Sequence, residues 1–324
     1  MIVQVHINGV RGLRNATVGS LSPISVLVGR NGCGKSTVLD VLSVAASENP
    51  TFAASVSFAR RSAEDGVSAS KWFVHSAMDR ATIKLRASEG SRDLVFARKN
   101  DDLLVQLGSH AIGHLTGQLA VNHTDIGSLT PKLVTDLRFV DMRARSQTRR
   151  PAHDLYSEAR TAGRKAVVVD LIRGLLPDVE DLEILTVDNR PVLHLSYQDR
   201  AVPLSLSGDG VRNIALLSFE LGVRPNSLIL VEEPETHLHP AAMISAAEAM
   251  VRTVRPQSKS ENQLVLATHS LEFIDALVRS AQKLGALDLL SVHRLSLENG
   301  ELKVSSLTGD LVLDARADAE LELR

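Results

Sequence analysis

The segment with the clearest chemistry is GRNGCGKS, residues 29–36. It satisfies the pattern G-x-x-x-x-G-K-[ST] between a run typical of a buried strand, 24–29, and a run with helical spacing of apolar residues, 35–47. Its three glycines allow backbone N–H groups to curl around phosphate oxygens, and the start of the following helix adds partial positive charge. This context predicts a phosphate-binding loop rather than a structural glycine turn.

Within this loop, Lys35 is expected to reach the β- and γ-phosphates of a bound nucleotide, and the Ser36 hydroxyl to ligate Mg²⁺. The other loop residues predicted to bind the nucleotide are Gly29, Arg30, Asn31, Gly32, Cys33, Gly34 and Thr37. Cys33 has two interpretations, because a helix N-terminus can activate a thiol for redox chemistry. We favour the simpler one, in which a small residue is needed at this position.

A second segment, SLILVEEPETHLHP at 227–240, ends an apolar run on two adjacent glutamates. A phosphate-binding loop with Mg²⁺ needs a carboxylate at the end of a neighbouring strand, and Glu232 is predicted to meet that need. Glu233 is predicted to aim across the site and to position or deprotonate the attacking water. A glycosidase-type carboxylate pair is a poor alternative, because adjacent strand residues point to opposite faces.

Two histidines, His237 and His239, follow these glutamates and raise the question of a zinc site. The neighbourhood has no cysteine and no H-E-x-x-H pattern, so zinc is disfavoured. His237 is interpreted instead as a loop contact near the nucleotide, and Pro240 as the first residue of the next helix.

Two further segments are weak alone but informative in their order along the chain. SGDG at 207–210 stands at the start of a predicted helix, where backbone N–H groups form a ready anion site. The strand-like run QLVLAT ends at THS, 268–270, where His269 is placed to touch a γ-phosphate.

The order of these motifs resembles that of the ATP-binding-cassette (ABC) class of P-loop ATPases: Walker A, signature, Walker B and a switch histidine. Within that class, NGVRGLRN, GRNGCGKST, LSGDGVRN, EEPETHLHP and ATHS together resemble the AAA_21/AAA_15, OLD-like group, relatives of the RecF and SMC ATPase heads. The resemblance implies an α/β fold of the ABC-ATPase type. Its mostly parallel sheet core is expected to carry an antiparallel β subdomain and a helical subdomain.

The resemblance also implies a role for each motif. Glu232 would be the Walker B acid that holds Mg²⁺ together with Ser36, and the catalytic residues would be Glu233, the switch histidine His269 and Lys35. The signature would bind the γ-phosphate of ATP held by the other subunit, through Ser207, Gly208, Gly210 and Arg212. The expected assembly is therefore an ATP-dependent head-to-tail homodimer with two ATP molecules in its interface.

The chain departs from the wider class in several places. No aromatic residue precedes Walker A to stack on adenine, and Asp209 and Gly210 replace the Gly and Gln of transporter cassettes, which disfavours a transporter subunit. Gln147 is a guess for the Q-loop glutamine. The stretch after His269 is expected to be too short for the Toprim nuclease domain of OLD nucleases, and no long heptad pattern indicates a coiled coil.

Length and composition set wider limits. A chain of 324 residues, 44% of them hydrophobic, can bury a large core in one domain or two joined lobes. A net charge of −2 argues against a dedicated electrostatic DNA binder, and 3% aromatic residues argue against a stacking platform for single strands. The single cysteine and the lack of a signal-peptide pattern or membrane-length apolar run predict a cytoplasmic protein without a membrane partner.

We expect one ABC-type ATPase domain with three parts, 1–114, 115–200 and 201–324. The first is predicted to hold Walker A and an antiparallel meander over 81–107, and the second a helical arm insertion with a helix over 153–175. The third is predicted to hold the signature, Walker B and switch histidine on alternating strands and helices, followed by a terminal hairpin. This alternation favours a mostly parallel sheet.

The second part carries a basic run. From Arg138 to Arg173, nine basic residues stand against four acidic ones, a local charge of +5. Such a run is more often a solvated helical face, and the alternative is a docking surface for phosphate, DNA or an acidic partner.

Two hypotheses about function remain open. In the first, the protein is an ATP-hydrolysing dimeric switch with a separately encoded effector, such as a nuclease in anti-phage defence, as the resemblance implies. In the second, it is a RecF/SMC-like ATPase of DNA repair or maintenance that grips DNA through the 138–173 segment. A steep salt dependence of DNA binding would favour the second hypothesis. A transporter ATPase and a nucleotide-binding protein that barely hydrolyses are weaker alternatives.

Overall fold

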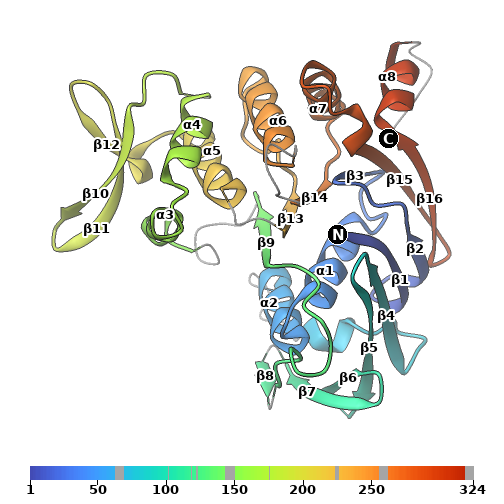
Figure 1. Cartoon of the computed structure of the whole chain (residues 1–324). Coiled ribbons are helices and arrows are strands. Elements are labelled where there is room, and N and C mark those ends of the chain that lie inside the picture. The colour runs from blue at the N-terminus through green and yellow to red at the C-terminus, as the bar shows by residue number, and fades with distance from the viewer. Residues whose placement is uncertain are drawn as a thin grey trace.

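The computed structural model describes residues 1–62, 69–100, 102–117, 119–121, 123–142, 150–174, 176–222, 226–254 and 262–317. These residues form a 13-stranded sheet and a separate 3-stranded sheet, with helices packed around both (Figure 1). No helix within the described ranges is long and apolar enough to cross a membrane.

The centre of the large sheet is parallel. Its strands lie in the order β9-β13-β14-β3-β15, and every neighbouring pair runs in the same direction. Their bounds are β3 (Ile24–Val28), β9 (Asp136–Asp141), β13 (Ser227–Glu232), β14 (Gln263–Ala267) and β15 (Leu290–Glu298). Strands covered on both faces need near-continuous apolar sequence, and β3, β13 and β14 are buried at every position.

Helices cover both faces of this parallel centre (Figure 1). They are α1 (Lys35–Ala46) on one face, and α6 (Pro240–Val254) and α7 (Leu271–Lys283) on the other. Because successive strand side chains point to opposite faces, Leu27 and Leu230 join the core around α1, whereas Val26 and Val231 join the core under α6 and α7.

The N-terminal half extends the same sheet with antiparallel strands. They are β1 (Ile2–Val10), β2 (Leu13–Val18), β4 (Arg80–Ala87), β5 (Gly90–Lys99), β6 (Asp102–Leu107), β7 (His110–Thr116) and β8 (Leu119–Val121). The meander predicted over 81–107 is confirmed as β4–β6, and β7 and β8 extend it to the edge of the sheet. The predicted terminal hairpin is also confirmed, because β15 pairs with β16 (Glu301–Thr308). Strand β16 in turn runs parallel to β2, so the hairpin joins the parallel centre to the antiparallel strands in one sheet.

Several elements had no counterpart in the sequence analysis. Among them are α2 (Pro50–Ser62), α8 (Gly309–Ala317), and the short helices η1 (Ala69–Trp72) and η3 (Leu287–Leu289). Of these, α2 matters most for function, because it packs beside α1 and brings its C-terminal arginines to the phosphate-binding end of the sheet.

A smaller subdomain lies to the left in Figure 1 and has its own apolar core. Its elements are α3 (Ala152–Thr161), α4 (Lys165–Arg173), α5 (Asp209–Leu221), η2 (Leu204–Leu206), and the strands β10 (Asp181–Val187), β11 (Arg190–Ser196) and β12 (Ala201–Pro203). The single helix predicted over 153–175 is divided into α3 and α4, because the chain turns at Gly163 with φ 70°. Residues 136–141, which the sequence analysis placed in the helical arm insertion, instead form strand β9 at the edge of the large sheet beside β13.

Candidate nucleotide-binding site

The phosphate-binding loop joins β3 to α1 at the C-terminal end of the parallel strands, the edge where open α/β sheets bind ligands. Lys35 folds back over this loop, and its Nζ donates to the carbonyl oxygens of Gly29 at 2.7 Å and Arg30 at 3.2 Å. Gly29 has φ 141°, and an added Cβ would lie 2.3 Å from the carbonyl oxygen of Leu295. The glycine is therefore required by both backbone conformation and space.

Cys33 packs inside the loop and is 5% exposed. Its Sγ lies 2.9 Å from the position that an added Cβ on Gly29 would take. Reactive cysteines occupy partly exposed positions, whereas buried cysteines are inert. This placement supports the interpretation of Cys33 as a small residue that fits beneath the loop.

The two residues predicted to ligate Mg²⁺ are in contact with each other. The Ser36 hydroxyl donates to Oε1 of Glu232, whose side chain is almost fully buried at the end of β13. Arg61 of α2 holds the same carboxylate, with Nη2 at 2.9 Å from Oε2 and Nη1 at 3.3 Å from Oε1. A hydroxyl and a carboxylate are oxygen ligands that suit Mg²⁺, so the donor set fits this ion.

Asp40 of α1 anchors the arginines around this site. It is 1% exposed and lies 2.6 Å from Arg11 and 3.1 Å from Arg61, and it also pairs with Arg60. Burial acts to raise the pKa of Asp40, but the three guanidinium groups outweigh it and hold that pKa below its usual value. Asp40 therefore remains a buried anion, and it connects Arg61 to the core of the protein.

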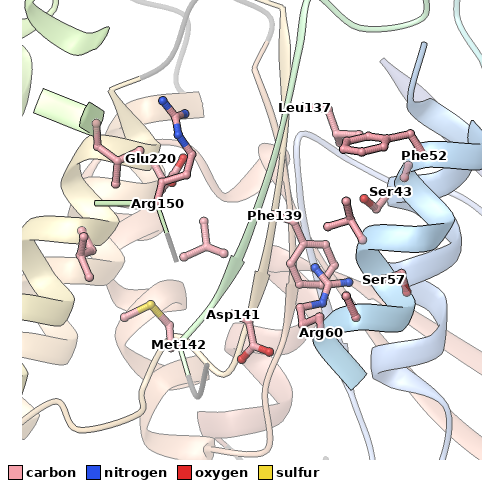
Figure 2. Close-up of a pocket in the computed structure, with 16 residues that line it drawn as sticks. Ser43, Phe52, Ser57, Arg60, Leu137, Phe139, Asp141, Met142, Arg150 and Glu220 are labelled. Carbon is pink, nitrogen blue, oxygen red and sulfur yellow. The ribbon is translucent and has the colours of Figure 1, made fainter. Parts of the chain in front are cut away.

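Arg60 extends this network of ion pairs to a cavity of about 620 Å³ between α2, β9 and the helical subdomain. Figure 2 shows its guanidinium group beside the ring of Phe139, and its Cζ lies 3.4 Å from the ring centroid. Asp141, the last residue of β9, and Met142, which follows it, also line this cavity. The ion pairs on Asp40 thus reach from the phosphate-binding loop to the junction between sheet and subdomain.

Glu233 faces a different partner from Glu232. Its backbone takes φ 51°, while its N–H still donates to the carbonyl oxygen of Ala267 at 2.8 Å. A left-handed conformation is costly for a residue other than glycine and is often found at functional sites. Oε1 of Glu233 lies 3.8 Å from Nδ1 of His269, so the second glutamate is directed toward the predicted switch histidine.

His269 and the phosphate-binding loop border one cavity of about 520 Å³. Its lining comprises Val28, Gly29, Arg30, Asn31, Glu235, His269, Ser270, Leu271, Glu272 and Ile274. The tertiary structure therefore brings Walker A and the end of β14 together, as the motif order implied.

The predicted signature lies outside this cavity, at the start of α5. Gly208 caps α5, and Asp209 pairs with Arg212 at 3.5 Å on an exposed turn. None of the signature residues is among the described residues that line the Walker A cavity. The start of α5 instead contacts the loop after β13. Asn213 Nδ2 donates to the carbonyl oxygen of Thr236 at 3.2 Å. An added Cβ on Gly210 would lie 3.0 Å from the carbonyl oxygen of His237.

The described basic side chains at 138–173 are largely paired within the chain. Arg138 lies 2.8 Å from Asp136 and also pairs with Glu158, and Arg150 lies 2.7 Å from Glu158. The hydrogen bond from Arg138, with further help from Arg150, lowers the pKa of Glu158 to about 2. The three remaining arginines of its first half, Arg143, Arg145 and Arg149, and the Q-loop guess Gln147 lie outside the described residues. The described part of the run thus stabilises the subdomain rather than forming a uniformly solvated face.

Sequence reasoning missed three charged residues of this site: Asp40, Arg61 and Glu235. Asp40 follows Lys35 on the same helix, and Arg61 belongs to the Arg-Arg pair in the last turn of α2, so neither has a motif of its own. Glu235 is the third acid within EEPE, and that density of charge after a buried strand was a usable signal.

SMC head domains are among the solved structures with the same architecture. An SMC head bound to the C-winged helix domain of ScpA matches with a TM-score of 0.63 at 13% identity, covering 97% of this chain and 99% of that chain. An SMC head with an extended coiled coil, bound to the C-terminal domain of ScpA from Pyrococcus furiosus, gives 0.58 at 12% identity, covering 99% of each chain. The SMC head of Thermotoga maritima gives 0.51 at 14% identity, covering 94% and 98%. The fold is therefore that of an ABC-type P-loop NTPase head.

Two family models match the chain in succession. Residues 4–120 match AAA_23, an AAA domain, and residues 124–275 match AAA_21, described as an AAA domain, putative AbiEii toxin, Type IV TA system. A stretch of 118 residues is 26% identical to the uncharacterized protein MJECL11 of Methanocaldococcus jannaschii, covering 36% of this chain and 98% of that protein. The chain therefore carries successive matches to P-loop ATPase domain models of the AAA_23 and AAA_21 type, and its fold is SMC-head-like.

Proposed function

We propose that this protein hydrolyses ATP and works as a nucleotide-driven dimeric switch. The observation that carries the proposal is that the described signature residues do not line the cavity that the phosphate-binding loop shares with His269, so one chain holds two separate halves of a nucleotide site. The phosphate-binding loop, the Walker B glutamates and His269 meet at one end of the sheet, whereas the turn at 207–210 belongs to the helical subdomain, where Gly208 and Asp209 are exposed. A head-to-tail pair of chains would join the halves and enclose a nucleotide at each contact.

In this proposal, the loop backbone and Lys35 hold the β- and γ-phosphates, and Ser36 with Glu232 holds Mg²⁺. When bound, Mg²⁺ supplies neutralisation of the negative charge on the phosphate oxygens. Glu233 orients the attacking water and accepts its proton, and His269 contacts the γ-phosphate. Ser207, Gly208, Gly210 and Arg212 of a second copy complete the site.

We further propose that a separately encoded effector reads the open and closed states of the dimer. Two of the similar SMC heads are described as bound to domains of ScpA, so this fold is compatible with a dedicated protein partner. A nuclease acting in antiviral defence is one such effector. The alternative, direct DNA binding through 138–173, is less well supported, because Arg138, Arg150 and Lys165 are engaged in ion pairs within the chain.

The test compares wild type with Glu233→Gln by molar mass, with and without Mg-ATP, and by phosphate release. We expect Glu233→Gln to accumulate as an ATP-dependent dimer that no longer releases phosphate, while wild type cycles. Ser207→Arg is the matched control: it should block the dimer but leave binding of a fluorescent ATP analogue to the monomer unchanged. If Glu233→Gln hydrolyses ATP like wild type and no mass change occurs, the proposed mechanism is wrong.

A further inference from the structure

Glu235 is a buried carboxylate for which the proposed reaction has no use. Its side chain is 8% exposed, two residues beyond Glu233, in the wall of the cavity that His269 shares with the phosphate-binding loop. Burying a charged group is costly unless the surrounding groups compensate it, so its partners indicate its role.

One oxygen of Glu235 contacts both residues that follow β14, Thr268 and His269. Oε1 accepts a hydrogen bond from the Thr268 hydroxyl at 2.6 Å and from the backbone N–H of His269 at 3.3 Å, and it lies 3.5 Å from Nδ1 of the His269 ring. The same carboxylate oxygen thus contacts both the backbone and the side chain of the histidine. His269 itself is 55% exposed, and its Nδ1 lies nearer to Oε1 of Glu235 than to Oε1 of Glu233, which is 3.8 Å away.

The second oxygen argues against a purely structural role. Oε2 of Glu235 is buried and has no hydrogen-bond partner among the described residues. A residue that served stability alone would be expected to satisfy both oxygens, because an unsatisfied buried acceptor costs about 1–3 kcal/mol. Such costs are tolerated where a group has a functional task.

We infer that Glu235 is the positioning residue for His269, an inference that rests on the proposed ATPase mechanism. A carboxylate beside Nδ1 fixes the ring orientation and the tautomer with the proton on Nδ1, which leaves Nε2 as the nitrogen that meets the nucleotide. Glu233, 3.8 Å from the same Nδ1, is close enough to be aligned by the same ring. Glu235 therefore couples the loop after β13 to the end of β14.

The substitution that tests this inference is Glu235→Gln, which keeps the size of the side chain and an acceptor for Thr268. We expect kcat for ATP hydrolysis to fall about 10–100-fold, with KM changed by less than about threefold, since loss of an orienting partner typically has this effect on activity. In a His269→Ala background, Glu235→Gln should have no further effect on kcat. Additive losses in the double variant would overturn the inference, because they would mean that Glu235 acts independently of His269.

A second readout does not depend on turnover. A proton–nitrogen correlation spectrum of the histidine rings, with His269 assigned from the His269→Ala variant, should show the proton on Nδ1 in wild type and a mixture of tautomers in Glu235→Gln. Thr268→Val is the matched control, because it removes a donor to the same oxygen but keeps the carboxylate beside the ring. An unchanged His269 tautomer in Glu235→Gln would refute the inference. If the tautomer differs between wild type and Glu235→Gln but wild type has no ATPase activity, the proposed function is refuted instead.

Discussion

Asp40 offers the most direct measure of how the site is held together. Its two oxygens serve three arginines: Oδ1 pairs with Arg60, and Oδ2 with Arg11 and Arg61. In Asp40→Asn, one oxygen becomes an NH₂ group that points its donors at a guanidinium group, which is itself only a donor. Whichever way the amide turns, at least one arginine loses its acceptor and faces a repulsive contact.

The magnitude follows from the burial of these groups. Removing one partner of a buried ion pair costs about 3–5 kcal/mol, because the other charge remains buried without compensation. Arg60 is 11% exposed and cannot turn to water, whereas Arg11 and Arg61, at 21% and 24%, can do so in part. We therefore expect Asp40→Asn to lower the free energy of unfolding by about 3 kcal/mol, at the lower end of that range.

The assay is urea denaturation at pH 7 followed by fluorescence and circular dichroism, with Arg11→Gln as the control. Arg11→Gln removes one partly exposed partner and leaves Asp40 with two cations, so it should cost about 1 kcal/mol. Because the folded-state pKa of Asp40 is held below its usual value, its contribution is complete above about pH 4 and is lost as the pH falls through the folded pKa. A loss below about 1 kcal/mol for Asp40→Asn, or equal losses for the two variants, would refute this reasoning.

Two further predictions concern the metal site and pH. Since Arg61 neutralises the carboxylate of Glu232, Arg61→Gln should lower the Mg²⁺ concentration for half-maximal binding of a fluorescent ATP analogue by about tenfold. Arg11 does not contact Glu232, so Arg11→Gln should leave that concentration unchanged. A higher Mg²⁺ requirement in Arg61→Gln would contradict this role. His293 is fully buried between two serine hydroxyls, and burial lowers its pKa to about 4. On acidification, His293 is therefore protonated at a higher pH in the unfolded chain than in the folded one. Between about pH 6 and 4, wild type should lose about 1.4 kcal/mol of stability per pH unit beyond the loss in His293→Gln. Parallel curves of stability against pH for the two proteins would exclude this effect.

The sequence alone determined the parts of this protein whose signal is local. The loop at 29–36 is recognisable because a fixed spacing of glycines, lysine and serine is what a backbone needs to surround a phosphate. The buried strands β3, β13 and β14 are recognisable because a strand covered on both faces must be apolar throughout. The order of the motifs then pointed to the ABC-type fold, which the similarity to SMC heads supports.

Only the tertiary structure decided which charges meet. Arg61 and Glu232 are 171 positions apart, and nothing near either residue in the sequence indicates their contact. The left-handed backbone at Glu233 and the burial of Glu235 against His269 depend on how β13 and β14 end side by side. Ion pairs and buried carboxylates are long-range features because the low-polarity surroundings that make them strong are built by segments distant in the chain, so their partners cannot be read from local spacing.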